Sequence, residues 1–352
     1  MLDHADEVLR TVLLDKPPRG PVLYPPMTET PRPPSLLADL VTLTKPRIIS
    51  LLLVTTIAPM FITGHGLPTL GRVLWVFLAG YLMAGGANAT NMWFDQDIDH
   101  LMTRTRTRPI PSGRIPSWGG LTFGVTLGAL SFWIFWTQVN HLSAWLALAG
   151  YLFYSIIYTI WLKRATPQNI VIGGAAGAFP PLVGWAAQAG SLDWTAVILF
   201  FIVVYWTPPH FWALALIKQK EYAKAGIPML PVVRGDHETK LQMLGYTIML
   251  LPLTLLPWLA GELGMVYALT ALLGGGWLLR YCIKLLREPG VVPATAWGMY
   301  KYSLVYLFLI FIAMGVDRAF TFGRLTRTPP PEVLILGGPG DKIPLEQVTG
   351  DR

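Results

Sequence analysis

Three polar residues recur at a spacing of four near the end of an apolar stretch. Asn91, Asp95 and Asp99 occupy positions i, i+4 and i+8, so on a continuous helix each is turned by about 40° from the previous one and all three share one face. Asn88 lies on nearly the same stripe, whereas Asp97 points away and is expected to be solvated. Carboxylates at this spacing repel each other, so the two aspartates on the stripe require a positive counter-charge.

A divalent cation can supply that counter-charge. Carboxylate and amide oxygens are hard ligands suited to Mg²⁺, which binds through one or two carboxylates together with substrate phosphates. Arg104 and Arg108 follow closely and offer forked donors that match phosphate oxygens. The sequence therefore predicts a magnesium and diphosphate site, with Asn91, Asp95 and Asp99 as metal ligands. The plainer alternative is a solvated acidic helix end whose arginines only mark membrane topology.

A second group of polar residues lies at the end of a later apolar stretch, within residues 205–231. Lys218 and Lys220 can neutralise phosphate, and Glu221 can reach a second metal ion or orient a lysine. This group follows the first by four apolar stretches. Such spacing indicates two four-helix halves with a site between them.

Both groups belong to an unusually apolar chain. Of its 352 residues, 53% are hydrophobic and 13% are charged, and the mean hydropathy is +0.48. A soluble protein carries about a quarter charged residues, and a disordered chain would lack the 14 Trp and 15 Phe found here. The composition therefore indicates an integral membrane protein that binds the lipid bilayer. Because Cys282 is the only cysteine, one chain cannot form a disulfide, a Cys-rich zinc site or an iron–sulfur cluster.

Apolar stretches long enough to cross a bilayer as helices recur along the chain. A spanning helix needs roughly 20 apolar residues, whereas barrel strands alternate over about ten. We therefore expect an all-α integral membrane protein with nine transmembrane helices. They centre on residues 46–64, 70–92, 117–136, 142–162, 169–188, 193–216, 241–260, 263–285 and 298–316.

The basic residues predict how these helices are oriented. The formal charge of +7 does not indicate nucleic-acid binding, because Lys and Arg are concentrated in every second connection between spans. By the positive-inside rule the N-terminus and these connections are cytoplasmic, and nine spans put the C-terminus outside. Residues 1–41 are expected to form a flexible, proline-rich cytoplasmic tail, residues 42–318 the transmembrane domain, and residues 319–352 a flexible C-terminal tail.

The motifs resemble a known family. Asn91, Asp95 and Asp99 match the Asn-x-x-x-Asp-x-x-x-Asp stretch of the UbiA-type intramembrane aromatic prenyltransferases. Other segments are similar to one branch of that superfamily, the protoheme IX farnesyltransferases or haem O synthases. These segments are Thr44-Lys45-Pro46-Arg47, Arg104-Thr105, Arg108-Pro109, Leu162-Lys163-Arg164, Asn169 through Gly174, Gly177 through Trp185, Pro208-Pro209-His210-Phe211-Trp212 and Tyr222 through Pro231. The likeness covers roughly residues 42–316.

The resemblance implies a fold and a reaction. The fold would be a UbiA-type bundle of two pseudo-repeated four-helix halves plus one helix. The reaction would transfer the farnesyl group of farnesyl diphosphate to a vinyl group of haem B, with addition of water, giving haem O and diphosphate. It implies Mg²⁺ as cofactor, a cell inner membrane location and a haem A synthase as a partner. Glu221 stands alone where the wider superfamily has two aspartates, as in the haem branch, and this leaves the second metal ion open.

The resemblance also assigns roles to individual residues. Glu221 joins Asn91, Asp95 and Asp99 as a catalytic candidate. The diphosphate candidates are Arg104, Arg108, Lys163, Arg164 and Lys218, and the haem or prenyl candidates are His210, Asn88, Asn169, Tyr205, Phe211 and Trp212. His210 could ligate iron or bind a propionate, or be a satisfied histidine at a helix end. Asn169 could cap a helix, and the aromatic residues could simply pack or line the membrane interface.

Two other functions compete with this interpretation. A prenyltransferase acting on an aromatic acid or quinone precursor would carry a paired second acidic motif, which this chain lacks. A transporter would place charges near the bilayer midplane in several spans. Here the acids and bases gather at one predicted membrane face. The glycines around Gly173, Gly174 and Gly177 are expected to allow close helix contact and not to bind phosphate, because no strand precedes them.

Overall fold

The computed structural model describes residues 35–321, and every regular element among them is helical. The helices are α2 (Leu36–Thr44), α3 (Pro46–Met60), α4 (Leu70–Phe94), α5 (Gln96–Asp99), α6 (Ser117–Ile134), η1 (Phe135–Val139), α7 (His141–Leu152), η2 (Phe153–Leu162), α8 (Lys163–Ala165), α9 (Asn169–Gly173), α10 (Ala175–Ala189), α11 (Trp194–Ile217), α12 (Gln219–Lys224), α13 (Leu230–Leu259), α14 (Met265–Arg287) and α15 (Pro293–Thr321). The segments η1 and η2 are π-helical.

The helices confirm an all-α integral membrane protein. In the described part of the chain, 8 helices are long and apolar enough to cross a membrane, and the number is 9 if α2 and α3, bent by 44°, count as one span. Each of the nine predicted spans has a helix. Helix α13 begins at Leu230, earlier than predicted, and is broken at Gly235, whose φ of 79° is in the region that favours glycine.

The ends of the helical domain differ slightly from the prediction. Helix α2 begins at Leu36, inside the predicted tail 1–41. It is held against the rest of the domain because Leu43 is buried in a hydrophobic cluster with Met92 and Ile110. Helix α15 continues to Thr321, three residues past the predicted boundary at 318. The remainder of both predicted tails, residues 1–34 and 322–352, lies outside the described residues.

Small residues let neighbouring helices approach closely. A Cβ placed on Gly86 of α4 would lie 2.6 Å from the carbonyl oxygen of Gly124 in α6, and one on Gly184 of α10 would overlap the backbone of Thr56 in α3. Lipid is as apolar as leucine, so membrane helices associate through such close packing rather than through the hydrophobic effect. These contacts hold α4 against α6 and α3 against α10.

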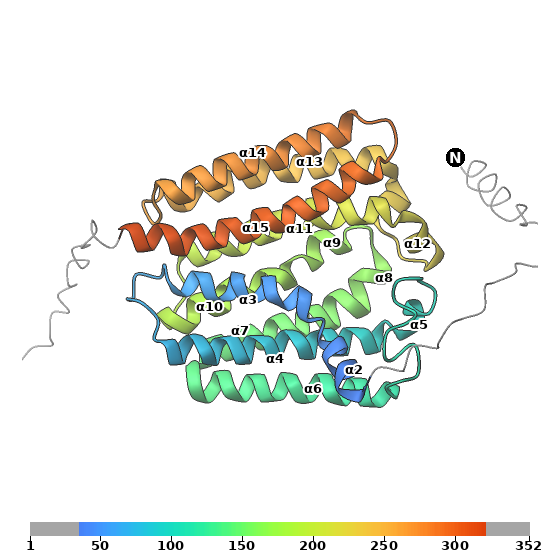
Figure 1. Cartoon of the computed structure of the whole chain (residues 1–352), viewed down its shortest axis with the longest axis horizontal. Coiled ribbons are helices and arrows are strands. Elements are labelled where there is room, and N and C mark those ends of the chain that lie inside the picture. The colour runs from blue at the N-terminus through green and yellow to red at the C-terminus, as the bar shows by residue number, and fades with distance from the viewer. Residues whose placement is uncertain (1–34, 322–352) are drawn as a thin grey trace, which may run out of the picture. The chain divides into compact units, whose positions relative to one another are not determined.

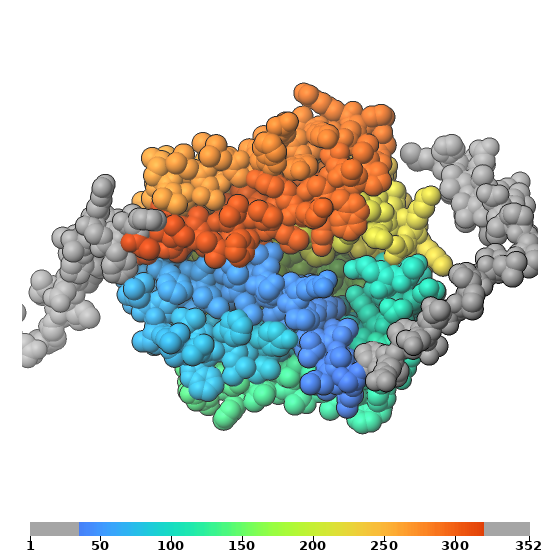
Figure 2. Space-filling model, viewed as in Figure 1, coloured from blue at the N-terminus to red at the C-terminus, as the bar shows by residue number. Residues whose placement is uncertain are grey.

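The short helices gather at one end of the bundle. In Figure 1, α5, α8 and α12 lie at the same end, beside α2, while the long helices run away from it. Figure 2 shows α3 and α15, coloured blue and orange-red, side by side on one face. The connections that carry the two polar groups therefore meet at one end of the membrane-spanning helices.

Candidate active site

The acidic stripe lies where α4 ends. The α-helix stops at Phe94, and Asp95 has φ −86° and ψ 0°, so the helix assumed for the stripe is interrupted there. The four-residue spacing nevertheless persists, because the Asp95 N–H donates to the Asn91 carbonyl at 3.0 Å and the Asp99 N–H donates to the Asp95 carbonyl at 2.8 Å. Asn91 Nδ2 also donates to Asp95 Oδ2 at 2.9 Å. Both aspartates are 2% exposed.

Cations from three separate segments neutralise this stripe. Lys163 Nζ lies 2.6 Å from Asp95 Oδ2, and Arg108 Nη1 lies 2.7 Å from Asp99 Oδ2. Lys45 Nζ donates to Asn91 Oδ1 at 2.8 Å. One oxygen of each carboxylate is therefore paired with a cation of the protein itself, which reduces the repulsion between the two acids.

Lys45 had not been identified as a site residue from the sequence. It joins α2 to α3 with φ 55° and ψ 61°, a left-handed conformation that is uncommon for any residue other than glycine and is concentrated at functional sites. The signal that could have found it is its position in the Thr44–Arg47 segment that resembles the family. Its strained backbone directs the ammonium group to Asn91.

A π-helix forms a wall of the site. In η2, Thr159 Oγ1 donates to the carbonyl of Tyr154, five residues earlier, at 2.8 Å, and receives a hydrogen bond from Asn91 Nδ2 at 3.0 Å. The rings of Tyr154 and Tyr158 stack with centroids 5.6 Å apart. Regular 3.6-residue periodicity cannot reveal these residues, because π-helical turns shift the faces of the helix.

Gly173 provides the space that Tyr158 occupies. A Cβ on Gly173 would overlap the Tyr158 ring, and one on Gly174 would lie 2.9 Å from Thr207 Cβ, whereas Gly177 has open space around it. The prediction that these glycines allow close helix contact is therefore confirmed for Gly173 and Gly174 and wrong for Gly177.

Substituting Gly173 with alanine should displace the Tyr158 ring and lower the rate of the proposed reaction about tenfold, because small shifts next to reacting groups are costly. The measurement is turnover by the purified variant in lipid nanodiscs. Gly177→Ala is the matched control, since its added methyl group meets nothing within 4 Å. Equal rates for both variants would refute the role of the Gly173 contact.

The second polar group faces the same end of the bundle. Lys218 Nζ and Glu221 Oε1 form an ion pair of 2.8 Å, and Glu221 Oε2 is buried without a hydrogen-bond partner among the described residues. Burial raises the pKa of Tyr222, and the charge of the exposed Arg104 opposes that rise. Ile98 and Met102 from α5 and the following loop belong to the same buried hydrophobic cluster as Tyr222 of α12, so the two polar groups are joined by one core.

Arg164 lies away from the stripe although it follows Lys163. Its two terminal nitrogens contact the Asp97 carboxylate at 2.6 and 2.7 Å, and Nη2 also donates to the carbonyl of Phe94. The hydrogen bond from Arg164 lowers the pKa of Asp97. Asp97 is 58% exposed, in agreement with the expectation that it is solvated.

The two candidate asparagines are buried in different surroundings. Asn88 Nδ2 donates to the carbonyl of Thr44 at 2.9 Å and so ties α4 to α2. Asn169 is the first residue of α9 and donates to the carbonyl of Thr166 at 2.7 Å, while Gln168 holds the capping position. The expected helix-cap role of Asn169 is therefore wrong. Its Oδ1 is buried and has no hydrogen-bond partner within residues 35–321.

His210 is packed between two aromatic rings. Trp206 stacks on it at 4.4 Å and Tyr300 at 4.7 Å, and its Nδ1 lies 2.7 Å from Ser303 Oγ. This arrangement matches the alternative of a satisfied histidine. The neighbouring candidates also have aromatic surroundings, since Tyr205 and Trp212 pack against Tyr246 and Phe211 is partly exposed. Across the described part of the chain, none of these candidates forms a hydrogen bond or ion pair with the acidic stripe.

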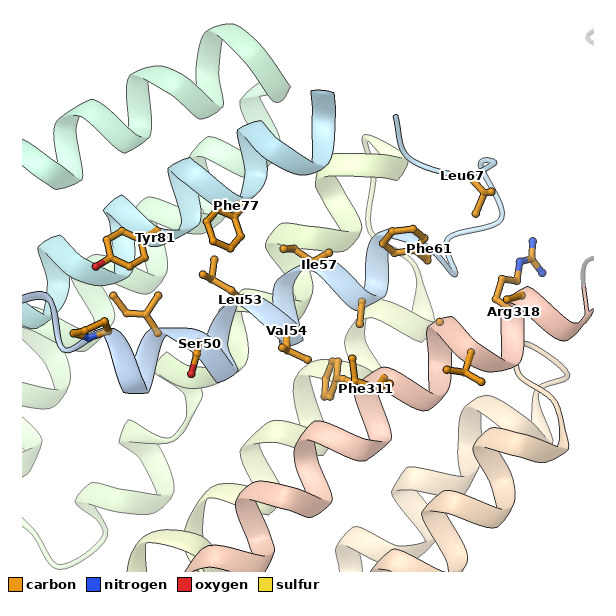
Figure 3. A pocket seen from close by; sticks show the side chains of 17 residues that line it. Ser50, Leu53, Val54, Ile57, Phe61, Leu67, Phe77, Tyr81, Phe311 and Arg318 are labelled. Atoms are coloured by element: carbon orange, nitrogen blue, oxygen red, sulfur yellow. The ribbon is translucent and has the colours of Figure 1, made fainter. Parts of the chain in front are cut away.

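An apolar groove lies among three of the long helices. It has a volume of about 950 Å³ and lies between α3, α4 and α15. Figure 3 shows Phe77 and Tyr81 of α4 on one side of it and Phe311 of α15 on another. Pro46, next to Lys45, lines one end, so the groove extends from the polar end of the bundle toward the opposite end.

The stripe suits a hard divalent cation. Asp95 Oδ1 is buried and has no hydrogen-bond partner in the described range, while the other oxygen of the same carboxylate accepts from Asn91 and Lys163. Residues 35–321 contain no group of three or more His, Cys, Asp or Glu side chains arranged to hold a metal ion. A site with two carboxylates fits Mg²⁺, which completes its coordination with water and substrate phosphates.

Comparison with known proteins agrees with the sequence motifs. Residues 51–311 match the UbiA prenyltransferase family. A protoheme IX farnesyltransferase of Roseiflexus sp. (strain RS-1) is 56% identical over 300 residues, which cover 84% of this chain and 56% of the relative. The protoheme IX farnesyltransferase of Symbiobacterium thermophilum is 51% identical over 282 residues, which cover 80% of this chain and 94% of the relative. The chain thus spans about half the length of the Roseiflexus relative and nearly all of the Symbiobacterium one, and the resemblance to this branch is confirmed.

Solved structures show the same fold at low sequence identity. A digeranylgeranylglyceryl phosphate synthase superposes with a TM-score of 0.64 at 20% identity, covering 80% of this chain and 98% of that one. A UbiA homologue from Archaeoglobus fulgidus bound to GPP and Mg²⁺ superposes with a TM-score of 0.59 at 15% identity. The match covers 78% of this chain and 99% of that one. Both likenesses concern the arrangement of the helices alone.

Proposed function

The chain belongs to the UbiA prenyltransferase family, and on that premise we propose that it transfers the farnesyl group of farnesyl diphosphate to a vinyl group of haem B. Water is added in the reaction, and the products are haem O and diphosphate. The observation that carries the proposal is the buried stripe of Asn91, Asp95 and Asp99, bordered by Lys45, Lys163 and Arg108. The name shared by the relatives at 51 to 56% identity supports haem as the acceptor.

Positive charge at the stripe favours departure of diphosphate. Asp95, Asp99 and Asn91 would hold Mg²⁺, which when bound neutralises negative charge on the leaving group. Lys163 and Arg108 already reach these carboxylates, so their donors are within side-chain reach of a diphosphate bound over the stripe. Donors fixed in place before the reaction stabilise developing charge without reorganisation.

The remaining contacts assign further roles in this proposal. Glu221 orients Lys218, as their 2.8 Å ion pair supports. Tyr154 and Tyr158 stack on each other in the π-helix whose Thr159 bonds to Asn91, and in this proposal their aromatic rings stabilise an allylic cation. The apolar groove between α3, α4 and α15 receives the prenyl chain, and surrounding lipid keeps water from the cation.

We propose that the haem acceptor binds near Asn169 and the aromatic residues of α11. Asn169 offers a buried oxygen that has no hydrogen-bond partner in the described part of the chain, and Phe211 is the most exposed of the aromatic candidates on α11. His210 acts through packing in this proposal, since both ring faces and Nδ1 are already engaged. Direct ligation of iron by His210 stays a prediction from the sequence.

The proposal extends to location and partners. The chain is a multi-pass membrane protein. We place it in the cell inner membrane with the polar end on the cytoplasmic side, where the basic connections lie. A haem A synthase would consume its product.

The competing functions have less support. The charged side chains of the site gather where α4 ends and α5, α8 and α12 lie, whereas a transporter would place them near the midplane of several spans. A quinone-precursor prenyltransferase would share the metal site, so the acceptor distinguishes it from a haem farnesyltransferase.

Product mass tests the acceptor directly. Purified protein in nanodiscs, supplied with Mg²⁺, farnesyl diphosphate and haem B, is expected to convert haem B to a species heavier by one farnesyl group and one hydroxyl group, because the proton of the added water leaves with the diphosphate. Chelation of Mg²⁺ should stop the conversion, and re-addition should restore it. Recovery of unmodified haem B from a preparation that prenylates 4-hydroxybenzoate instead would refute the haem assignment.

A further inference from the structure

An ion pair outside the stripe joins α2 to the loop that follows the acids. Arg114 Nε donates to both oxygens of Asp39 at 3.1 and 2.9 Å, and Nη2 donates to Oδ1 at 3.0 Å. Asp39 is only 3% exposed. A forked arginine on a buried carboxylate fixes the relative orientation of two segments more strictly than an exposed ion pair does.

The same arginine holds the loop that carries Arg108. Its Nη2 donates to the carbonyl of Thr107 at 3.1 Å and its Nη1 to Ser112 Oγ at 2.7 Å. Ser112 Oγ donates in turn to the Arg108 carbonyl at 2.7 Å. The Arg108 guanidinium binds Asp99. Hydrogen bonds from Asp39 to the Arg108 backbone, together with the Arg108 side chain, therefore connect α2 with the acidic stripe.

The other end of α2 reaches the stripe as well. The Thr44 carbonyl accepts the hydrogen bond from Asn88, and Lys45, the next residue, donates to Asn91. Between these ends, Leu43 is buried in the cluster that includes Ile110 from the loop. Helix α2 therefore contacts both α4 and the loop, and the Asp39–Arg114 pair closes its far end.

We propose that Asp39 and Arg114 are positioning residues that set the affinity for the prenyl diphosphate. By holding α2 against residues 107–114, they keep the Arg108 guanidinium over Asp99 where the phosphate oxygens bind. This inference rests on the proposed function, because it assigns a diphosphate to that place. Loss of the pair should weaken diphosphate binding without altering how the haem acceptor is bound.

Calorimetry on the full chain in nanodiscs with Mg²⁺ tests the inference, using inorganic pyrophosphate and the unreactive analogue farnesyl thiodiphosphate as probes. Asp39→Asn is expected to weaken both probes roughly tenfold, and Arg114→Lys, which keeps the charge but loses the fork, should act in the same direction. Arg106→Gln is the matched control, because it removes an exposed arginine of the same loop, and it should change affinity by less than about twofold.

Kinetics separate positioning from general destabilisation. In the Asp39→Asn variant the KM for farnesyl diphosphate should rise while the KM for haem B stays unchanged. A purely structural defect would lower the active fraction and move neither KM. If Asp39→Asn fails to fold, an unchanged affinity in folded Arg114→Lys overturns the inference. If the wild-type protein binds neither pyrophosphate nor farnesyl thiodiphosphate, the proposed function itself is contradicted. If the wild-type protein and both variants bind these probes with equal affinity, only the positioning role is contradicted.

Discussion

Replacing Asp95 with asparagine is expected to lower kcat about 10³-fold, because a pre-organised group that stabilises transition-state charge contributes on that scale. Asp95 accepts hydrogen bonds from Asn91 and Lys163 on Oδ2, while its buried Oδ1 has no hydrogen-bond partner among residues 35–321. Asparagine keeps the shape and can still accept a hydrogen bond, but it removes the negative charge that a magnesium ion requires. Asp99→Asn should have a similar effect. The measurement is haem O formation by each variant under saturating substrates.

The control for these variants is Asp97→Asn. Asp97 lies between the two acids in sequence, but its carboxylate is 58% exposed and paired with Arg164, so the change should alter kcat by less than about threefold. Thermal unfolding in nanodiscs verifies that all three variants are folded. Near-normal turnover by Asp95→Asn and Asp99→Asn would rule out the metal-binding role of the stripe.

Replacing Lys163 with glutamine should lower kcat about 10²-fold, on the scale of losing one donor to a developing anion. The Lys163 side chain is largely buried and its ammonium lies 2.6 Å from Asp95, beside the position proposed for the diphosphate. Lys163→Arg should recover part of the activity, because it restores the charge with a different shape. Single-turnover formation of haem O measures the chemical step.

The neighbouring Arg164 offers a matched comparison. It has the same charge and adjoins Lys163 in sequence, but it binds Asp97 and the carbonyl of Phe94 at a more exposed position. Arg164→Gln is therefore expected to reduce kcat by no more than about threefold, because exposed ion pairs contribute little. Equal losses in Lys163→Gln and Arg164→Gln would show that total positive charge, and not position, determines the rate.

The spans and the location of the site could be predicted because their signals are local. Apolar stretches of bilayer length predicted the helices, and the charges in their connections predicted which ends meet. The spacing of Asn91, Asp95 and Asp99 also survived, although the α-helix breaks at Asp95, because backbone hydrogen bonds continue the four-residue step. Arg108 lies nine residues from Asp99, but Lys45 and Lys163 lie 46 and 68 residues from their partners, and no local pattern encodes these two pairings.

Side-chain partners were decided by the tertiary structure. Lys163 and Arg164 look equivalent in sequence, yet the turn of η2 and α8 directs one to buried Asp95 and the other to exposed Asp97. The sequence left two roles open for His210, haem binding or a satisfied histidine, and only the tertiary structure shows that its ring is stacked between Trp206 and Tyr300.

By itself, the sequence determined a helical membrane protein with a magnesium-compatible acidic stripe at one end, since hydropathy, charge placement and four-residue spacing are properties of neighbouring residues. Only the tertiary structure decided that Lys45 reaches Asn91 through a left-handed turn, that a π-helix brings Thr159 to Asn91, and that Asp39 binds Arg114. These arrangements depend on how distant helices pack, and packing fixes which of several chemically similar side chains comes within bonding distance.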